Sequence, residues 1–455
     1  MEINKPLYET TPSQGVIEIQ AKYSIFKEIA NILTYAVCDF EVDEELMKKA
    51  INLVIERNDC LRLTYIKKDK KLMQYFRDEN PISNIKKIKF NTMEEYKAFI
   101  LKYRKIALNF KKGEVIDVVF TTMPDGKFNI IIKFCHLVVD AYGIGVIYQD
   151  LFAVYKALAD NTELPPAPGK FEELIKKDLV NKNNEQKYSD DKKFFEEIID
   201  ARAKMGELRY AGVHGNDCDV WQKQLKKGKK GMKQFFICNK SKSYMYEINK
   251  DFCDKVMDFC KETKVTPANL FFYCYSVVAS KINNDTKLMS PLELCNCRGT
   301  LAEKKTAGQK VQSVACFTDV NPDKTFEENF NEFCANQNTL YRHLGFPDME
   351  KEKMYAKAFR SSFLETFYQV IFSFIAVKNM DGVTMGMLSN GRFTTPCYLA
   401  LMYNVDDGCI RAIYECQEKI IKDKHVEDYH NNLIKVLEQV MDNPKIMMKD
   451  IKVKI

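Results

Sequence analysis

The feature of the sequence that most restricts the possible folds is a strand–turn–strand–helix pattern in its first third. Two apolar runs, Val115–Thr122 and Phe128–Phe134, flank Pro124-Asp125-Gly126, which is a typical hairpin turn. The second run is followed by the short segment His136–Asp140 and then by a helical pattern over Gly143–Leu158. A strand pair that continues through a short loop into a helix predicts an α/β fold.

The same alternation of helices and strands extends over the rest of the chain and starts again in its second half. The spacing predicts further helices over Asp43–Asn58, Met93–Leu108, Phe171–Leu179, Asp190–Met205, Asp251–Thr263, Pro267–Ile282, Phe326–His343 and Asp423–Met441. It predicts further strands over Leu61–Ile66, Ser243–Ile248, Met289–Cys295, Val311–Asp319, Tyr368–Phe374, Val383–Leu388, Tyr398–Val405 and Cys409–Tyr414.

The length of the chain indicates more than one domain. At 455 residues it exceeds the usual size of a single hydrophobic core, so we expect two α/β halves. The expected boundaries are an N-terminal half over residues 1–180, a helical and lysine-rich linker over 181–240, and a C-terminal half over 241–455. The run Lys226–Lys230 is interpreted as a solvated surface segment, with attraction of an anionic substrate as the alternative.

Charge and composition exclude several classes of protein. The 69 basic and 63 acidic residues give a net charge of +6, which is too balanced for a nucleic-acid-binding protein. The longest apolar run, Ala268–Ala279, is too short to span a bilayer, and the polar N-terminus has no signal-peptide pattern. The 15 cysteines lack the spacing of a disulfide framework, which indicates a reducing compartment. We therefore expect a soluble cytoplasmic protein without a membrane span.

The sequence contains no pattern typical of a metal site. In the closest cysteine pair, Cys295-x-Cys297, one residue separates the thiols, and this is not the usual zinc spacing. The histidines form no HExxH pair. We interpret the cysteines as small buried hydrophobic residues and expect no metal and no permanently bound cofactor.

His136 is the strongest candidate for chemistry. It follows the apolar strand directly, and Asp140 comes four residues later, before the predicted helix. A loop between strand and helix can expose an imidazole while its neighbours fix the tautomer, and an imidazole suits proton transfer near neutral pH. The spacing alone is weak evidence, because a purely structural histidine would look the same.

Four further segments give the sequence a resemblance to a known superfamily. In order along the chain these are Tyr8–Gln14, Glu56–Tyr65, Cys135–Ala141 (similar to an HHxxxDG motif) and Tyr148–Tyr155. Together they resemble the condensation-domain and chloramphenicol-acetyltransferase superfamily, which includes the BAHD and alcohol acyltransferases. In the second half, Asn296-Cys297-Arg298 and Ser389-Asn390-Gly391 are similar to two later segments of that superfamily.

The resemblance implies a fold and a mechanism. The fold is α/β, with two chloramphenicol-acetyltransferase-like sandwich halves around a central tunnel. The mechanism is direct acyl transfer, with His136 as general base and no acyl-enzyme. Asp140 is implied to be structural and to pair with an arginine, for which Arg298 is the candidate, in a bidentate ion pair.

Two positions depart from the superfamily motif, because Cys135 stands in place of its first histidine and Ala141 in place of its glycine. Gly143 is expected to supply the flexibility that Ala141 lacks. Successive strand residues point to opposite faces, so Cys135 and His136 are not expected to act as a nucleophile–base pair.

Three groups are candidates for contacts to the substrate or to an oxyanion. The backbone N–H of Gly143 lies at the start of a predicted helix, where the dipole also favours negative charge. The side chains of Ser389 and Asn390 are the other two candidates. Ser389-Asn390-Gly391 is equally well interpreted as a plain turn between strands.

Three functional hypotheses follow. The first is a stand-alone, monomeric acyltransferase that transfers an acyl group from a thioester, such as acyl-CoA, to a hydroxyl or amine of a small-molecule acceptor. The second is a discrete nonribosomal-peptide condensation enzyme whose donor is an acyl-phosphopantetheine on an acyl or peptidyl carrier protein. The third is a non-catalytic, acyltransferase-like binding protein, which the replacements at Cys135 and Ala141 would favour.

Overall fold

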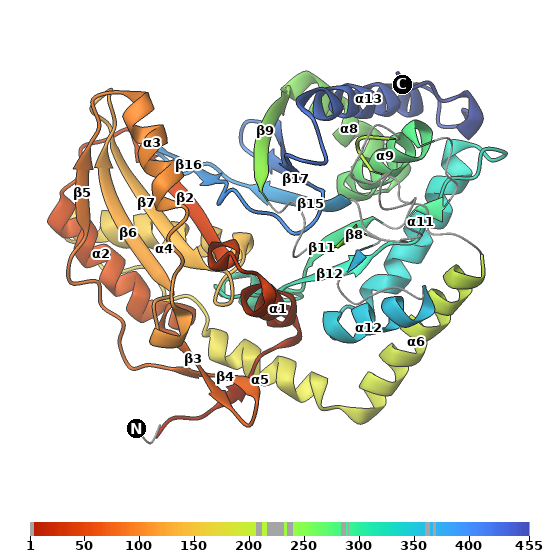
Figure 1. Cartoon of the computed structure of the whole chain (residues 1–455). Coiled ribbons are helices and arrows are strands. Elements are labelled where there is room, and N and C mark those ends of the chain that lie inside the picture. Colours follow the sequence, from red (N-terminus) through yellow and green to blue (C-terminus); the bar gives the residue numbers. More distant parts are fainter. Residues whose placement is uncertain are drawn as a thin grey trace. The chain divides into compact units, whose positions relative to one another are not determined.

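The computed structural model describes residues 4–205, 212–215, 232–233, 240–283, 288–289, 291–359, 365–366 and 370–454 (Figure 1). The chain divides into two compact units. Unit 1 comprises residues 1–185, 296–311 and 379–391, and unit 2 comprises residues 186–295, 312–378 and 392–455. The lysine run at 226–230 lies outside the described residues.

Unit 1 is organised around a five-stranded sheet in the order β16-β2-β7-β6-β5. Strand β7 (Phe128–Cys135) pairs antiparallel with β2 (Asn31–Cys38) on one side and with β6 (Ile116–Thr122) on the other (Figure 1). The register places Asn31 opposite Cys135, so the end of β7 lies beside the start of β2. The outer strands are β16 (Val383–Leu388), antiparallel to β2, and β5 (Lys86–Lys89), parallel to β6.

Side chains on alternate positions of this sheet enter two separate cores, as the period of a strand requires. On β7, Ile130 and Ile132 join the larger core, to which helices α2 (Glu44–Arg57) and α4 (Ala141–Ala159) contribute. Ile131 belongs to a smaller core together with residues of α3 (Met93–Tyr103). The sheet is therefore covered by apolar packing on both faces.

The remaining elements of unit 1 are smaller. A three-stranded sheet has the order β1-β4-β3. Its strands are β1 (Tyr8–Glu9), β4 (Lys71–Phe76) and β3 (Leu63–Lys68), and the other helices are α1 (Gly15–Tyr23), α5 (Phe171–Lys182) and α10 (Leu301–Lys304).

Unit 2 is organised around a six-stranded sheet in the order β12-β11-β15-β17-β18-β9. Strands β11, β15 and β17 run parallel, and β18 and β9 are antiparallel to their neighbours. The strands of this sheet are β9 (Ser241–Ile248), β11 (Leu292–Asn296), β12 (Val311–Ala315), β15 (Val370–Val377), β17 (Cys397–Asn404) and β18 (Ile410–Gln417). Two short pairs join β10 (Leu288–Met289) to β13 (Thr318–Asp319) and β8 (Met232–Lys233) to β14 (Glu365–Thr366).

The core of unit 2 is built around α9 (Pro267–Ile282), whose residues 270–275 are all buried. The neighbouring helix α13 (Asp423–Asp442) places apolar residues such as Leu433 and Leu437 in the same core. The other helices of unit 2 are α6 (Glu185–Lys204), α8 (Lys250–Thr263), α11 (Phe326–Tyr341) and α12 (Asp348–Ala358). No described helix has both the length and the apolar character needed to cross a membrane.

The predicted α/β class is confirmed, and most predicted elements are present within a few residues of their expected bounds. The prediction of one strand over Val311–Asp319 is wrong, because β12 ends at Ala315 and β13 is a separate two-residue strand. The predicted strand Met289–Cys295 is likewise divided, and Pro291, which has no N–H for a ladder bond, lies between the two pieces.

The sequence did not predict β2 or α12. Strand β2 is central and nearly all of it is buried, so it lacks the polar–apolar alternation that identifies a half-exposed strand. Unit 1 also includes residues 296–311 and 379–391, which the expected contiguous boundaries assign to the C-terminal half. Hydrogen bonds of the first of these segments to the loop after β7 give the physical reason for this grouping.

Candidate active site

The loop that joins β7 to α4 carries His136 and is held at both ends. The backbone N–H of His136 donates to the carbonyl of Ala30, 2.7 Å away, beside the start of β2. The N–H of Val138 turns back to the carbonyl of Cys135 at 3.0 Å. The loop therefore leaves the sheet sharply at the point where the histidine side chain begins.

The tautomer of the His136 imidazole follows from its hydrogen bond. Nδ1 lies 3.1 Å from the carbonyl oxygen of Val139, which can only accept. In the neutral ring Nδ1 is therefore protonated, and Nε2 carries the free lone pair. The side chain is partly exposed, in contrast to the buried residues on either side of it. A neutral ring whose Nε2 lone pair is not used by Val139 is the form that a general base needs.

The electrostatic surroundings of His136 act in opposite directions. Burial of the ring lowers its pKa below the ordinary value of 6.5 and is the largest effect. The negative charge of Asp140, the carbonyl of Val139 and the side chain of Gln309 oppose it by favouring the protonated ring. The net direction is downward, so the ring is neutral and able to accept a proton near neutral pH.

Asp140 is the N-cap of α4, and both oxygens of its carboxylate accept hydrogen bonds. Oδ1 accepts from the N–H of Gly143 at 2.7 Å, which satisfies one of the free donors at the start of the helix. Oδ2 accepts from Arg298 Nη1 at 3.0 Å and from the N–H of Lys310 at 2.7 Å. The N–H of Asp140 itself donates to the carbonyl of Gly308 at 3.2 Å.

The guanidinium of Arg298 donates hydrogen bonds to several acceptors. Besides Asp140, Nη2 donates to the carbonyl of Gly308 at 2.7 Å and Nε to that of Thr306 at 3.3 Å. The expectation of a bidentate ion pair is wrong, since only Nη1 reaches Asp140 and the other donors hold the backbone of residues 306–308. The side chain of Arg298 is 0% exposed and that of Asp140 is 1% exposed. The ion pair therefore fastens the loop to the segment after β11.

The structure gives Gly143 a different role from the two that were expected. Its N–H is engaged by Asp140, so it is not a free donor for an oxyanion, contrary to expectation. A Cβ at this position would lie 2.8 Å from the backbone nitrogen of Gly308 and 2.8 Å from Val139. Gly143 is therefore required for close approach of two backbones and not for flexibility.

Ala141 and Cys135 fit the structure without strain. Ala141 is the first residue of α4 and is not among the described non-glycine residues with positive φ. A methyl group is tolerated there because helical backbone does not need glycine. Cys135 is 1% exposed, and burial raises its pKa to about 12, so it stays a thiol and not a thiolate nucleophile.

Ser389 and Asn390 follow β16 and belong to unit 1. The amide of Asn390 donates to the carbonyl of Asn31 at 2.9 Å, at the start of β2, and Ser389 Oγ accepts from the N–H of Gly391. Gly391 has φ +78°, a conformation that favours glycine. These contacts make the segment a turn that fastens β16 to β2, beside Ala30 and His136.

The middle of the loop is held by an amide and a hydroxyl group, neither of which was predicted to be a site residue. The carbonyl of Leu137 accepts from Gln14 Nε2 at 2.9 Å and from the hydroxyl of Tyr65 at 3.0 Å. Gln14 is held in turn by Gln74, through an amide hydrogen bond of 2.9 Å. Gln14 and Tyr65 are the last residues of two segments that carry the family resemblance. Their place in those segments was the sequence feature that could have identified them.

Two of the segments that carry the family resemblance, Glu56–Tyr65 and Tyr148–Tyr155, contact each other. Arg57 Nη2 contacts Asp150 at 2.8 Å, and Asn58 donates to the other oxygen of that carboxylate at 2.9 Å. Tyr148 shares a hydrogen bond of 2.8 Å with Thr34 of β2. These contacts join α2, α4 and the central sheet. They therefore fix the positions of the elements from which the His136 loop extends.

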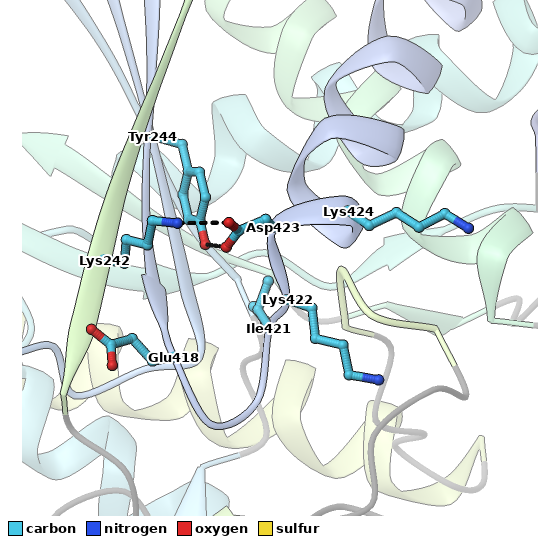
Figure 2. Close-up of a pocket in the computed structure, with 7 residues that line it drawn as sticks. All are labelled: Lys242, Tyr244, Glu418, Ile421, Lys422, Asp423 and Lys424. Atoms are coloured by element: carbon cyan, nitrogen blue, oxygen red, sulfur yellow. Dashed lines mark hydrogen bonds and ion pairs between the residues drawn. The ribbon is translucent and has the colours of Figure 1, made fainter.

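Unit 2 has a surface pocket of about 540 Å³ that is separate from these residues. Figure 2 shows Lys242 and Tyr244 reaching the carboxylate of Asp423, each with a distance of 2.7 Å. The pocket contains no imidazole or thiol among its lining residues, which are Lys242, Tyr244, Glu418, Ile421, Lys422, Asp423 and Lys424. Across the described part of the chain, no three His, Cys, Asp or Glu side chains are arranged to hold a metal.

Comparisons with known proteins show the family and the fold of the chain. The profile of the condensation domain family matches residues 4–453. A plipastatin synthase protein of Bacillus subtilis (strain 168) is 18% identical over 438 residues, which are 93% of this chain and 16% of that protein. Gramicidin S synthase 2 of Brevibacillus brevis is 25% identical over 129 residues, or 27% of this chain and 3% of that protein. The chain thus spans a small part of the length of these relatives.

Solved structures share the fold over nearly the whole chain. A variant of the starter condensation domain of rhizomide synthetase RzmA, in complex with C8-CoA and Leu-SNAC, superposes with a TM-score of 0.81 at 12% identity, covering 99% of this chain and 98% of that one. The condensation domain of Monacolin K polyketide synthase MokA gives a TM-score of 0.78 at 12% identity, covering 97% and 99%. Both are α/β folds of the same size as this chain.

Replacing Asp140 by alanine is expected to destabilise unit 1 by about 3–5 kcal/mol, because Arg298 would remain buried without its charge partner. Chemical denaturation followed by circular dichroism measures this change. The control is Glu173→Ala, which removes an exposed ion pair to Lys176 and should leave stability close to that of the wild type. A stable but inactive Asp140→Asn variant would instead indicate a direct chemical role for Asp140.

The rate should depend on the neutral form of His136. Because burial lowers the pKa of this ring, the base form persists below pH 6.5 and is lost only as the pH falls through the shifted value. We expect kcat/KM for acyl transfer, measured from about pH 5 to pH 8, to fall on the acidic side with a midpoint below 6.5. A midpoint above 6.5 would show that the charge of Asp140 outweighs burial.

Proposed function

The chain belongs to the condensation-domain family, as its motifs predicted, and we propose that it transfers an acyl group from a thioester donor, such as acyl-CoA, to a small-molecule hydroxyl or amine. His136 is the general base of this reaction. The observation that carries the proposal is the hydrogen bond from Nδ1 to the carbonyl of Val139, which leaves Nε2 as the lone pair of a partly exposed, neutral ring.

The proposed reaction is a direct displacement at the thioester carbonyl. Nε2 of His136 accepts the proton of the acceptor as its oxygen or nitrogen attacks the carbonyl carbon. The new C–O or C–N bond forms, the C–S bond breaks, and the imidazolium returns the proton to the departing thiolate. Base catalysis of this kind contributes about 10²–10⁴-fold in rate, and the alignment of two bound substrates contributes more.

Asp140 and Arg298 have a positioning role in this scheme. Both carboxylate oxygens of Asp140 accept hydrogen bonds from its own loop and from residues 298 and 310. No described donor of Arg298 points to a reacting group, because each is engaged by Asp140, Asn296 or a backbone carbonyl. Their contribution is to keep the His136 loop in a single conformation.

A discrete condensation enzyme with a carrier-bound donor is the second candidate. It is favoured by the alignment with the plipastatin synthase protein, which covers 93% of this chain. The acyl-CoA proposal is favoured by the starter condensation domain of rhizomide synthetase RzmA, which was solved with C8-CoA. The two candidates share the chemistry at His136 and differ only in the group that carries the thioester.

Replacing His136 by alanine should lower the rate of acyl transfer by at least about 100-fold while the melting temperature stays within a few degrees of the wild-type value. The reason is that the ring is not part of the buried hydrogen-bond network of Asp140, so its removal leaves that network intact. Product formation by mass spectrometry and thermal unfolding are the two measurements. His425→Ala, a histidine of unit 2, is the control and should remain active. Full activity of His136→Ala would contradict the mechanism.

The donor can be identified by incubating the wild-type protein with a series of acyl-CoA thioesters and, separately, with acyl groups on a carrier protein. Release of coenzyme A, measured by chromatography and abolished in His136→Ala, is the expected result. Release from the carrier protein alone would establish the second candidate. No release from either donor, with or without an added amine or alcohol, would favour a non-catalytic binding protein.

A further inference from the structure

Two thiols lie face to face in the core of unit 2. Cys397 is the first residue of β17 and Cys416 lies near the end of β18, and the register of these antiparallel strands sets the two residues directly opposite each other. Their sulfur atoms are 3.4 Å apart. Both residues are 0% exposed, and the proposed acyl transfer uses neither of them.

The backbone at this position suits a bond between the two sulfurs. The N–H of Gln417 donates to the carbonyl of Pro396 at 2.9 Å, so this ladder bond lies beside the two cysteines and not between them. Opposite residues of such a non-hydrogen-bonded pair have Cα atoms about 4.5 Å apart, and disulfides span Cα separations of about 4.4–6.8 Å. The sulfurs need only close from 3.4 Å to about 2.05 Å, which side-chain movement achieves.

The two sulfurs are not equivalent. Cys416 donates its S–H to Cys397 Sγ, and the hydroxyl of Tyr275 on α9 also donates to that sulfur, at 3.8 Å. Two donors are thus directed at Cys397 Sγ, where negative charge develops when a sulfur attacks an oxidant. Burial raises the pKa of the Cys416 thiol, which keeps its hydrogen in place. Cys397 is therefore the sulfur that reacts first, and Cys416 is the one that completes the bond.

The pair lies where the β17–β18 ladder ends. Cys397 and Cys416 are the outermost opposite residues of the two strands, and the connection between the strands, at residues 405–409, is at the other end. The adjoining ladder bond, from Gln417 to Pro396, has no counterpart because Pro396 has no N–H. The end of a ladder opens more readily than its middle. A small oxidant therefore reaches these buried sulfurs through local opening, without global unfolding.

We propose that Cys397 and Cys416 are a reversible oxidation site, which a peroxide converts to a cross-strand disulfide. In the first step Cys397 Sγ attacks one oxygen of hydrogen peroxide, the O–O bond breaks, and a sulfenic acid and water form. In the second step Cys416 Sγ attacks the sulfenic sulfur, the S–S bond forms, and the thiol hydrogen leaves with the hydroxyl as a second water. The two thiols lose two electrons and the peroxide gains them. A dithiol reverses the change by becoming a disulfide itself.

The disulfide clamps the open end of the β17–β18 hairpin. Strand β17 also pairs with β15 and β18 with β9, so both strands lie inside the six-stranded sheet. A covalent bond at the ladder end prevents its local opening, and the closed loop restricts the unfolded chain. The oxidised protein should therefore resist unfolding better than the reduced protein. This inference is independent of the proposed function.

The first test maps the disulfide in the folded wild-type protein. The full chain is treated with hydrogen peroxide near neutral pH, catalase removes the peroxide, and iodoacetamide in denaturant blocks the remaining thiols before digestion with trypsin. Cleavage after Arg392, Arg411 and Lys419 places the two cysteines on separate peptides, so their bond links residues 393–411 to residues 412–419. We expect mass spectrometry to detect this linked peptide, and dithiothreitol to abolish it.

Cys409 provides a matched control, because it lies on the same tryptic peptide as Cys397. It belongs to the other end of the hairpin, is partly exposed and donates to the carbonyl of Asp407. The linked peptide should disappear in Cys397→Ala and remain in Cys409→Ala. A link that persists in Cys397→Ala would overturn the inference. So would wild-type protein in which Cys397 and Cys416 stay thiols, or become separate sulfinic acids, after treatment with peroxide.

Hydrogen exchange gives a second measurement, which needs only the wild type. In the reduced protein the amide of Gln417 exchanges through opening of the ladder end. We expect exchange in peptides that cover Gln417 to slow after oxidation and to recover after dithiothreitol, and we expect the Tm to be higher in the oxidised protein. Equal exchange rates and equal Tm values in the two forms would overturn the role of the bond as a clamp.

Discussion

The buried carboxylate of Asp140 is the constraint on which the site depends. A negative charge taken out of water requires close compensation, and here it is surrounded by Arg298 Nη1 and by the N–H groups of Gly143 and Lys310. These donors come from two parts of the chain, the first turn of α4 and residues 296–311. Their convergence sets the first turn of α4 and joins residues 296–311 to unit 1. The close contact of Gly143 with Gly308 is the steric counterpart of the same junction.

This arrangement separates the groups that hold the loop from the group proposed to act on substrates. Leu137 is fixed by Gln14 and Tyr65, and Asp140 by Arg298 and Lys310, whereas the His136 ring is held through Nδ1 by the carbonyl of Val139. The histidine is thus supported from both sides while its Nε2 remains available. A rigid surround that leaves one ring nitrogen unprotonated is the preorganisation that proton transfer requires.

Much of the fold could be predicted from the sequence, because helices such as α2, α9 and α13 and the β6–β7 hairpin carry clear local patterns. The position of His136 at the end of a strand could also be predicted, because the apolar run of the strand directly precedes it in the sequence. The contacts of Gln309 and Gln14 could not be predicted, since they join residues far apart in the chain and a lone glutamine has no distinctive spacing. Gly143 was misjudged for the same reason, because the backbone that approaches it, at Gly308, comes from a distant segment.

The late position of residues 296–311 has a consequence for synthesis on the ribosome. At about 5–20 residues per second, Arg298 is added roughly 5 to 25 seconds after residue 185, where the first segment of unit 1 ends. During that interval the nascent chain contains Asp140 and the whole central part of its sheet, but not the arginine that neutralises the carboxylate. Unit 1 therefore cannot complete its fold in the order in which it is made, and much of unit 2 emerges before the His136 loop is fastened.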